Sequence, residues 1–206
     1  MKNPYKVNTH YFGTHSIISR ELKNNESVLD IGCNDGYLKT LTKRNSFYGI
    51  DYSKNSLVKA KKNGYIKVLF ADLNSYSKVK LNKKFDVIVF ADVLEHLLHP
   101  EKVLKYFIKN NLKPNGKIIV SLPNVANFMI RTSLLFGKFD YTDAGILDRT
   151  HLHLYTTKSA LDLIKATHLK VTKILYASNN FGLLIKHAQF LGSLLGHNII
   201  LVCKKK

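Results

Sequence analysis

The sequence predicts a doubly wound α/β fold, in which helices cover both faces of a mostly parallel sheet. Three observations carry this prediction. Short apolar runs alternate with segments of helical periodicity, as in repeated strand–helix–strand units. These runs are nearly continuous stretches of Val, Ile, Leu and Phe, which is typical of parallel strands covered on both faces. No Gly- or Ser-rich linker or internal repeat interrupts the series, so we expect a single domain over residues 1–206.

The expected elements follow one another at short intervals. A short helix in residues 1–24 would cap the sheet. Strands are expected at 27–32, 47–51, 66–72, 85–92 and 117–123. Helices are expected at about 36–43, at 54–62, and after Pro100 through about Lys109. The last of these is amphipathic, with one apolar face formed by Val103, Leu104, Phe107 and Ile108. Asn115-Gly116 predicts a turn before the fifth strand.

Two segments depart from the simple alternation. Residues 124–150 form a long insertion after the fifth strand, and long loops in compact domains are usually lids or binding elements. Residues 181–203 are apolar but broken by Lys186 and His187, which predicts a helix and a last strand and not a transmembrane span. The apolar stretches 125–139 and 181–195 lie in a chain rich in lysine, so peripheral membrane contact is an alternative to burial in the core.

The composition limits the partners and the compartment. The formal charge is +18, which would favour RNA, anionic lipid or acidic substrates. Only four of the 32 basic residues are arginine, however, and nucleic-acid sites favour the forked contacts of arginine, so compositional bias is the simpler interpretation. Two distant cysteines and an N-terminus without an apolar run predict a cytoplasmic protein.

Acidic residues gather where the first four strands end. The chain has 14 carboxylates, and six of them lie there: Asp30, Asp35, Asp51, Asp72, Asp92 and Glu95. Ligands of open α/β sheets bind at this edge, so the acids predict a ligand with hydroxyls, amines or positive charge, with helix capping as the alternative. In the loop 30–36, Gly32 and Gly36 permit a tight turn, and the amides of the next helix favour a carboxylate. The spacing is not that of a dinucleotide site.

These motifs resemble the class I S-adenosylmethionine-dependent methyltransferases. The resemblance covers roughly residues 25–180, and the matching stretches occur in the family's order: VLDIGCNDG (28–36), YGIDYS (48–53), FADL (70–73), FDVIVFADVLEH (85–96) and LKPNGKIIVSLPN (112–124). It implies S-adenosylmethionine as the cofactor. It also implies a Rossmann-like sheet of seven strands whose last strand is antiparallel.

The resemblance also implies which residues bind the cofactor: Asp30, Gly32, Cys33, Asn34, Gly36, Asp51, Tyr52, Asp72, Leu73 and Asp92. The loop 30–36 would shape the pocket for the methionine part. Asp51 would accept hydrogen bonds from the ribose hydroxyls, and Asp72 would meet the adenine amino group, with Leu73 against the ring. Asn34 stands where the family often has a third glycine, and asparagine tolerates left-handed backbone better than other side chains.

Two histidines are the candidate catalytic bases for methyl transfer. His96 follows the fourth strand, and His151 closes the long insertion together with His153, which an extended backbone would point the other way. We expect no metal. The alternative is a divalent cation on Asp92, Glu95, His96 and His151. This pattern is similar to that of small-RNA 3′-terminal 2′-O-methyltransferases and to that of the ubiquinone-pathway O-methyltransferases.

The function predicted is O-methylation of a small molecule, a sugar or a lipid-linked intermediate. The stretch 145–156 is similar to methyltransferases of bacterial sugar, lipid and surface-polysaccharide pathways, in which this region closes over the acceptor. A metal-dependent RNA 2′-O-methyltransferase is one alternative. A non-catalytic membrane-surface module with the same fold is the other.

Overall fold

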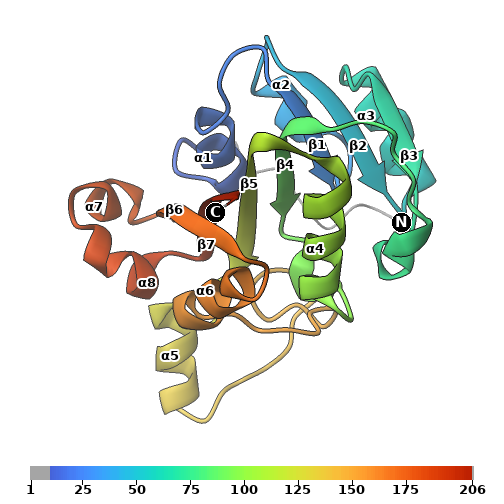
Figure 1. Ribbon diagram of the computed structural model, residues 1–206. Coiled ribbons are helices and arrows are strands. Elements are labelled where there is room, and N and C mark those ends of the chain that lie inside the picture. The colour runs from blue at the N-terminus through green and yellow to red at the C-terminus, as the bar shows by residue number, and fades with distance from the viewer. Residues whose placement is uncertain (1–9, 206) are drawn as a thin grey trace.

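The computed structural model describes residues 10–205, which are built around one seven-stranded sheet. Its strands are β1 (Ser27–Ile31), β2 (Ser46–Asp51), β3 (Lys67–Phe70), β4 (Phe85–Ala91), β5 (Leu112–Pro123), β6 (Leu169–Ala177) and β7 (Asn198–Lys205). The strand order is β3-β2-β1-β4-β5-β7-β6 (Figure 1). Strands β1 to β5 pair in parallel, whereas β7 is antiparallel to both β5 and β6. The predicted fold, including its antiparallel last strand, is confirmed.

Helices connect the strands and extend beyond them. The α-helices are α1 (Thr14–Arg20), α2 (Tyr37–Thr40), α3 (Lys54–Lys62), α4 (Pro100–Asn111), α5 (Phe128–Leu135), α6 (Thr157–Lys165), α7 (Gly182–His187) and α8 (Gly192–Leu195). Short 3-10 helices are η1 (Leu73–Lys78), η2 (Leu94–His96) and η3 (Gln189–Leu191). The helix expected within residues 1–24 is α1, which packs against β6 and β7. Residues 1–9 of that expectation lie outside the described part of the chain.

Each face of the sheet is covered by a separate apolar layer. Successive residues of a strand point to opposite faces. Thus Leu29 packs in the layer that contains Phe107 of α4 and Ile164 of α6. Val28 packs in the opposite layer, which contains Leu57 of α3. Burial on both faces explains the continuous apolar runs of the central strands.

Three sequence predictions need correction. The helix expected at 36–43 ends at Thr40, because the chain must turn before β2 begins at Ser46. The fifth strand begins at Leu112 and not at residue 117. The expected turn at Asn115-Gly116 is part of this strand, at a place where its register with β4 is irregular.

The remaining predictions match the structure more closely. The helix expected at 54–62 is α3, and the amphipathic helix after Pro100 is α4. Segment 181–203 contains α7, α8 and most of β7, as expected. Among residues 10–205, we find no helix with both the length and the apolar character needed to cross a membrane.

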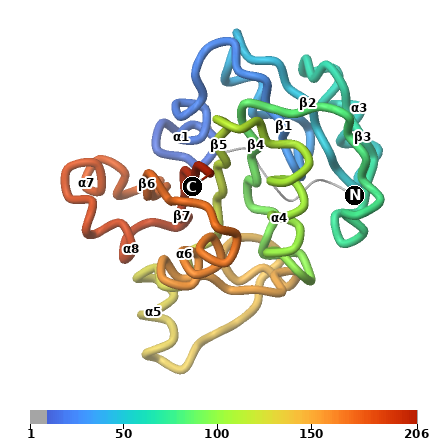
Figure 2. Tube along the Cα trace, in the orientation of Figure 1, coloured from blue at the N-terminus to red at the C-terminus, as the bar shows by residue number. Residues whose placement is uncertain are grey.

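The insertion 124–150 projects from the carboxyl ends of the parallel strands. It begins after β5, forms α5, and returns through an extended loop that leads to α6 (Figure 2). None of the residues of α5 is buried. Asn124 and Asn127 tie its start to the body of the protein, because their side-chain amides donate to the carbonyl of Gly196. The insertion is thus anchored at its base and exposed beyond it.

Gly36, at the start of α2, provides a test of how tightly this edge is packed. Its φ is +75°, and a Cβ there would lie 2.6 Å from the backbone of Ala60. Gly137 has a similar φ of +69° but open space around it. We expect Gly137→Ala to lower the free energy of unfolding by about 1 kcal/mol through backbone strain alone. Gly36→Ala should cost about 1–3 kcal/mol more because of the clash. Urea denaturation measures both, and equal losses would contradict this packing.

Candidate active site

The loop between β1 and α2 adopts the backbone that the sequence predicts. Gly32, Asn34 and Gly36 all have positive φ, at +71°, +45° and +75°. A Cβ on Gly32 would come within 2.3 Å of the Val93 side chain, so only glycine fits there. Asn34 occupies left-handed backbone, as expected for asparagine at this position. The loop therefore turns sharply beside the end of β4 and is tied to β2, because the amides of Gly32 and Cys33 donate to the carbonyl of Ile50.

Asp51 connects this loop to the end of β2. Its buried carboxylate accepts a hydrogen bond from the amide of Asn34 at 2.8 Å and another from the amide of Ser53 at 2.8 Å. Each carboxylate oxygen can accept more than one hydrogen bond, so acceptor capacity remains for a ligand. Asp51 is thus a structural anchor for the loop and for the start of α3.

Asp30 and Cys33 lie beneath the loop. The Tyr65 hydroxyl donates to Asp30 at 2.5 Å. Burial raises the pKa of Asp30 to about 7, the Tyr65 hydrogen bond opposes this shift, and nearby Asp51 adds to it. The thiol of Cys33 is buried against Gly49, where a Cβ would come within 2.5 Å of the sulfur, and its pKa is raised, mainly by burial. Asp30 and Cys33 thus pack the loop against Tyr65 and Gly49.

The other predicted residues of the cofactor group lie at the ends of β2 and β3. Tyr52 is 78% exposed. Asp72 is exposed and accepts from the amide of Asn74 at the start of η1, so it does cap a short helix, while Leu73 is buried. Asp35, in contrast, pairs with Lys59 at 2.9 Å on α3, so one of its oxygens is directed away from the crevice.

Asp92 follows β4 with a left-handed φ of +53°. Its carboxylate accepts hydrogen bonds from Ser121 of β5 at 2.6 Å and from Asn198 of β7 at 2.5 Å. The sequence analysis missed these two donors, since only strand pairing brings residues 92, 121 and 198 together. It also missed His15 and His197, whose pKa values are lowered by burial while the negative charge of Asp92 opposes the shift.

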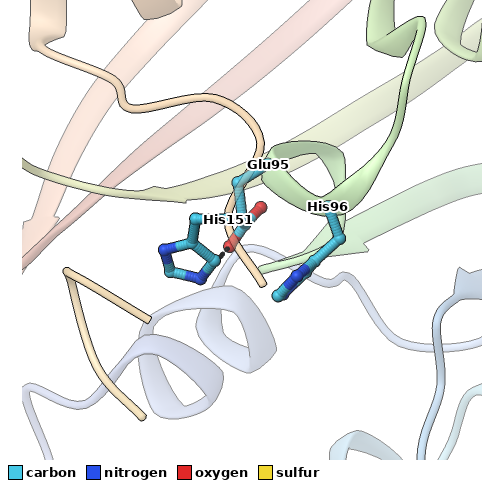
Figure 3. A group of neighbouring side chains, drawn as sticks. All are labelled: Glu95, His96 and His151. Carbon is cyan, nitrogen blue, oxygen red and sulfur yellow. Dashed lines mark ion pairs between the residues drawn. The ribbon is translucent and has the colours of Figure 1, made fainter. Parts of the chain in front are cut away.

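Glu95, His96 and His151 form a compact group next to Asp92. Glu95 and His96 come from η2, and His151 comes from the returning insertion (Figure 3). One potential ligand atom of each residue lies within 4.8 Å of the others. The distance from His151 Nε2 to Glu95 Oε1 is 4.0 Å. Asp92, the fourth residue of the alternative cation site, is not part of this group, and its Oδ1 accepts from Ser121 and Asn198.

Hydrogen bonds favour one tautomer of each of the two histidines. Nδ1 of His151 lies 3.0 Å from the carbonyl of Ile146, and Nδ1 of His96 lies 3.1 Å from the carbonyl of Thr150. A carbonyl only accepts, so these contacts favour the tautomer with the hydrogen on Nδ1, and the hydroxyl of Thr150 also lies 3.0 Å from Nδ1 of His96. His153 is directed elsewhere, with Nε2 at 2.9 Å from the carbonyl of Leu97. As predicted, only one of the paired histidines joins the group.

Burial controls the protonation of this group. The side chain of Glu95 is fully buried, and among the described residues neither of its carboxylate oxygens has a hydrogen-bond partner. Burial raises the pKa of Glu95 well above its ordinary value, and Asp92 and Asp148 raise it further. Burial lowers the pKa of His96, although the hydrogen bond with Thr150 opposes this shift. His96 is therefore a neutral imidazole at pH 7, able to accept a proton.

A known protein family matches most of the chain. Residues 7–174 match the family described as "Methyltransferase domain". The chain belongs to this family. With the loop, strand order and acidic edge described above, it is a class I S-adenosylmethionine-dependent methyltransferase domain.

Individual relatives are more distant. The methyltransferase is 32% identical over 115 residues to a mitochondrial ubiquinone biosynthesis O-methyltransferase of Candida albicans. The matched region covers 50% of this chain and 35% of that protein. The chain thus spans about a third of the length of that relative. Among solved structures, a methyltransferase from Thermotoga maritima superposes with a TM-score of 0.67 at 18% identity, covering 94% of this chain and 88% of the other.

A second solved structure is the N-methyltransferase NodS from Bradyrhizobium japonicum in complex with S-adenosylhomocysteine. It superposes with a TM-score of 0.65 at 15% identity and covers 100% of this chain and 93% of the other. At such identities, both structures support the fold of the methyltransferase and leave its acceptor open.

A cavity of about 480 Å³ lies beside the histidine group of the methyltransferase. Helix α5 forms one wall of the cavity and residues 178–181 another. Ile146, whose carbonyl binds His151, and His197 also line it, which connects the cavity to the site. Its surface combines apolar side chains such as Phe128 and Phe181 with several amides and hydroxyls. A partly apolar molecule with hydroxyl groups would suit this lining.

The raised pKa of Glu95 predicts a pH-dependent stability. When the pKa of a carboxyl is higher in the folded protein than in the unfolded chain, the protein becomes less stable as pH rises between these two pKa values. For Glu95 the unfolded pKa is near 4.5 and the folded pKa is well above it. In the presence of chelator, we expect Glu95→Gln to match the wild type at pH 4. At pH 8 it should be about 1–3 kcal/mol more stable, because the buried charge is gone. Urea denaturation across pH measures this, with exposed Asp143→Asn as the control. A loss of stability at pH 8 would refute the burial argument.

Proposed function

We propose that this methyltransferase transfers the methyl group of S-adenosylmethionine to a hydroxyl oxygen of a small molecule, sugar or lipid-linked acceptor. One observation carries the proposal. The loop after β1, anchored by Asp51 at the end of β2, and the neutral His96 after β4 lie at the carboxyl ends of neighbouring parallel strands. The O-methyltransferase among its curated relatives supports oxygen as the accepting atom.

The cofactor would occupy the edge between β1 and β3. Asp51 would accept hydrogen bonds from the ribose hydroxyls, as its position after β2 and its remaining acceptor capacity suggest. Asp72, exposed after β3, would meet the adenine amino group. The left-handed loop at Gly32 and Asn34 would admit the methionine part without a Cβ in the way. Asp92, held by its two donors, would carry negative charge close to the sulfonium.

The transfer step needs a base close to the acceptor. The acceptor oxygen attacks the methyl carbon in line with the C–S bond, and the bonding electrons return to sulfur to give S-adenosylhomocysteine. His96 Nε2 takes the hydroxyl proton, since its Nδ1 is already bound to Thr150. His151, behind it, is the second candidate base, but its side chain is only 4% exposed and its Nε2 lies beside Glu95. We therefore assign the proton transfer to His96.

Cofactor binding tests the first half of this proposal. We expect Asp51→Asn to weaken binding of S-adenosylhomocysteine about 10- to 100-fold, because the carboxylate loses a charge-assisted contact to the ligand. Asp35→Asn is the matched control at the same edge, since its carboxylate pairs with Lys59. Calorimetric titration of both folded variants measures the dissociation constants. The proposal fails if wild-type protein binds no S-adenosylhomocysteine, or if both variants bind as tightly as wild type.

A divalent cation on Glu95, His96 and His151 is the second candidate for how this site works. A fully buried carboxylate without a hydrogen-bond partner and two imidazoles with free Nε2 atoms fit such an ion, and this donor set suits several transition metals. When bound, the ion would act as a Lewis acid that lowers the pKa of the acceptor hydroxyl. The RNA 2′-O-methyltransferase alternative depends on this same group. It would also require RNA binding that weakens steeply with salt.

Metal binding can be measured without any acceptor. If the cation site exists, Mn²⁺ titrated into cofactor-free protein will bind at one equivalent, seen as loss of the free-ion electron paramagnetic resonance signal. Glu95→Gln and His151→Asn should each weaken binding about tenfold or more. His99→Asn, at an exposed histidine four residues from Glu95, should not. Absence of binding, or binding unchanged in Glu95→Gln, would leave His96 as a base without metal.

A further inference from the structure

The insertion and the C-terminal helices leave an unusual amount of apolar surface uncovered. On α5 and directly after it, Met129, Leu134, Leu135 and Phe136 are between 57% and 80% exposed. On α7 and η3, Leu183, Leu184 and Phe190 are between 47% and 81% exposed. We call these seven side chains the apolar rim. Exposed apolar groups of this size on neighbouring elements usually mark an interaction site.

Contacts at the base of the rim hold its two halves together. The rings of Phe128 and Phe181 meet edge to face at 5.6 Å, which joins the start of α5 to the start of α7. The side-chain amide of Asn124 donates to the carbonyl of Ser193 on α8 at 2.9 Å. Both helices project on the same side of the molecule, away from the β3 edge of the sheet (Figure 1). The rim is therefore a fixed feature of the fold.

Positive charge predominates around the rim. No Asp or Glu occurs between residues 102 and 139 or between residues 163 and 206, and Asp140 is the first carboxylate after α5. Both halves of the rim lie within these ranges, and the exposed Arg131, Lys138 and Lys186 are close in sequence to its apolar side chains. Apolar side chains flanked mainly by lysine and arginine match the surface of an anionic bilayer.

We propose that the apolar rim docks the methyltransferase on the surface of a membrane that contains anionic lipid. The leucine and phenylalanine side chains would enter the boundary between head groups and acyl chains, while the basic residues meet the head groups. The cavity of about 480 Å³ adjoins the rim, because Met129 of the rim and Phe181, directly before α7, both line it. Docking would place this cavity next to the bilayer, so the acceptor would be a lipid-linked molecule. This choice of acceptor rests on the proposed function.

Vesicle binding by the full chain tests this proposal without cofactor or acceptor. We expect the protein to co-sediment with vesicles of phosphatidylcholine and phosphatidylglycerol and to bind pure phosphatidylcholine more weakly. The double variant Leu135→Asn, Phe136→Asn should bind the anionic vesicles about tenfold less or weaker, because two apolar side chains no longer enter the membrane. Both residues are exposed, so the fold should survive, as circular dichroism would check.

A matched control separates the rim from the general positive charge. Val58→Asn, Ile66→Asn removes two side chains that are 57% and 58% exposed near β3, at the opposite edge of the sheet. This variant should bind vesicles like the wild type. Three outcomes would overturn the proposal. The two double variants could bind vesicles equally, the wild type could bind no vesicles, or sedimentation equilibrium could show that the rim pairs two copies of the chain. Binding of S-adenosylhomocysteine, measured separately, shows whether the proposed function stands or fails on its own.

Discussion

The site depends on the two hydrogen bonds that Asp51 accepts from backbone amides of the chain. One amide belongs to the loop after β1 and the other to the start of α3, so a single carboxylate joins two neighbouring crossovers where their strands end. Hydrogen bonds to an ionised carboxylate are stronger than neutral ones. The hydrogen bond from the amide of Asn34 to Asp51 links the left-handed backbone at Asn34 to the end of β2. The amides of Gly32 and Cys33, which both donate to the carbonyl of Ile50, hold the same turn against β2.

A second constraint comes from the buried carboxylate of Glu95. The fold brings it to the end of β4, and its backbone carbonyl accepts from the amides of Leu152 and His153, which closes the insertion over the site. The same residue thus positions the returning chain and places a group of raised pKa beside two imidazoles. A structural role alone would not require an ionisable side chain there, since the closing contacts use only its backbone. A bound cation, the second candidate for how this site works, would use the carboxylate as a ligand.

The sequence was most informative where local chemistry decides the structure. The left-handed loop and the parallel strands buried on both faces follow from glycine spacing and continuous apolar runs. Strand β6 was not recognised from its residues, because an edge strand with lysines at positions 170 and 173 lacks a long apolar run. Asn198 as a partner of Asp92 was equally hidden, since the pairing of β5 with β7 creates that contact across more than a hundred residues. Likewise, no local pattern shows that α5 stays exposed.

The central claim is that the acidic, glycine-containing edge of the sheet holds the cofactor with its sulfur directed toward the histidine group. A crystal structure of the methyltransferase with S-adenosylhomocysteine tests this most directly. The account predicts the ribose hydroxyls on Asp51, the adenine near Asp72, and the sulfur facing the space between Asp92 and His96. A nucleoside bound elsewhere, or a sulfur directed away from His96, would contradict it.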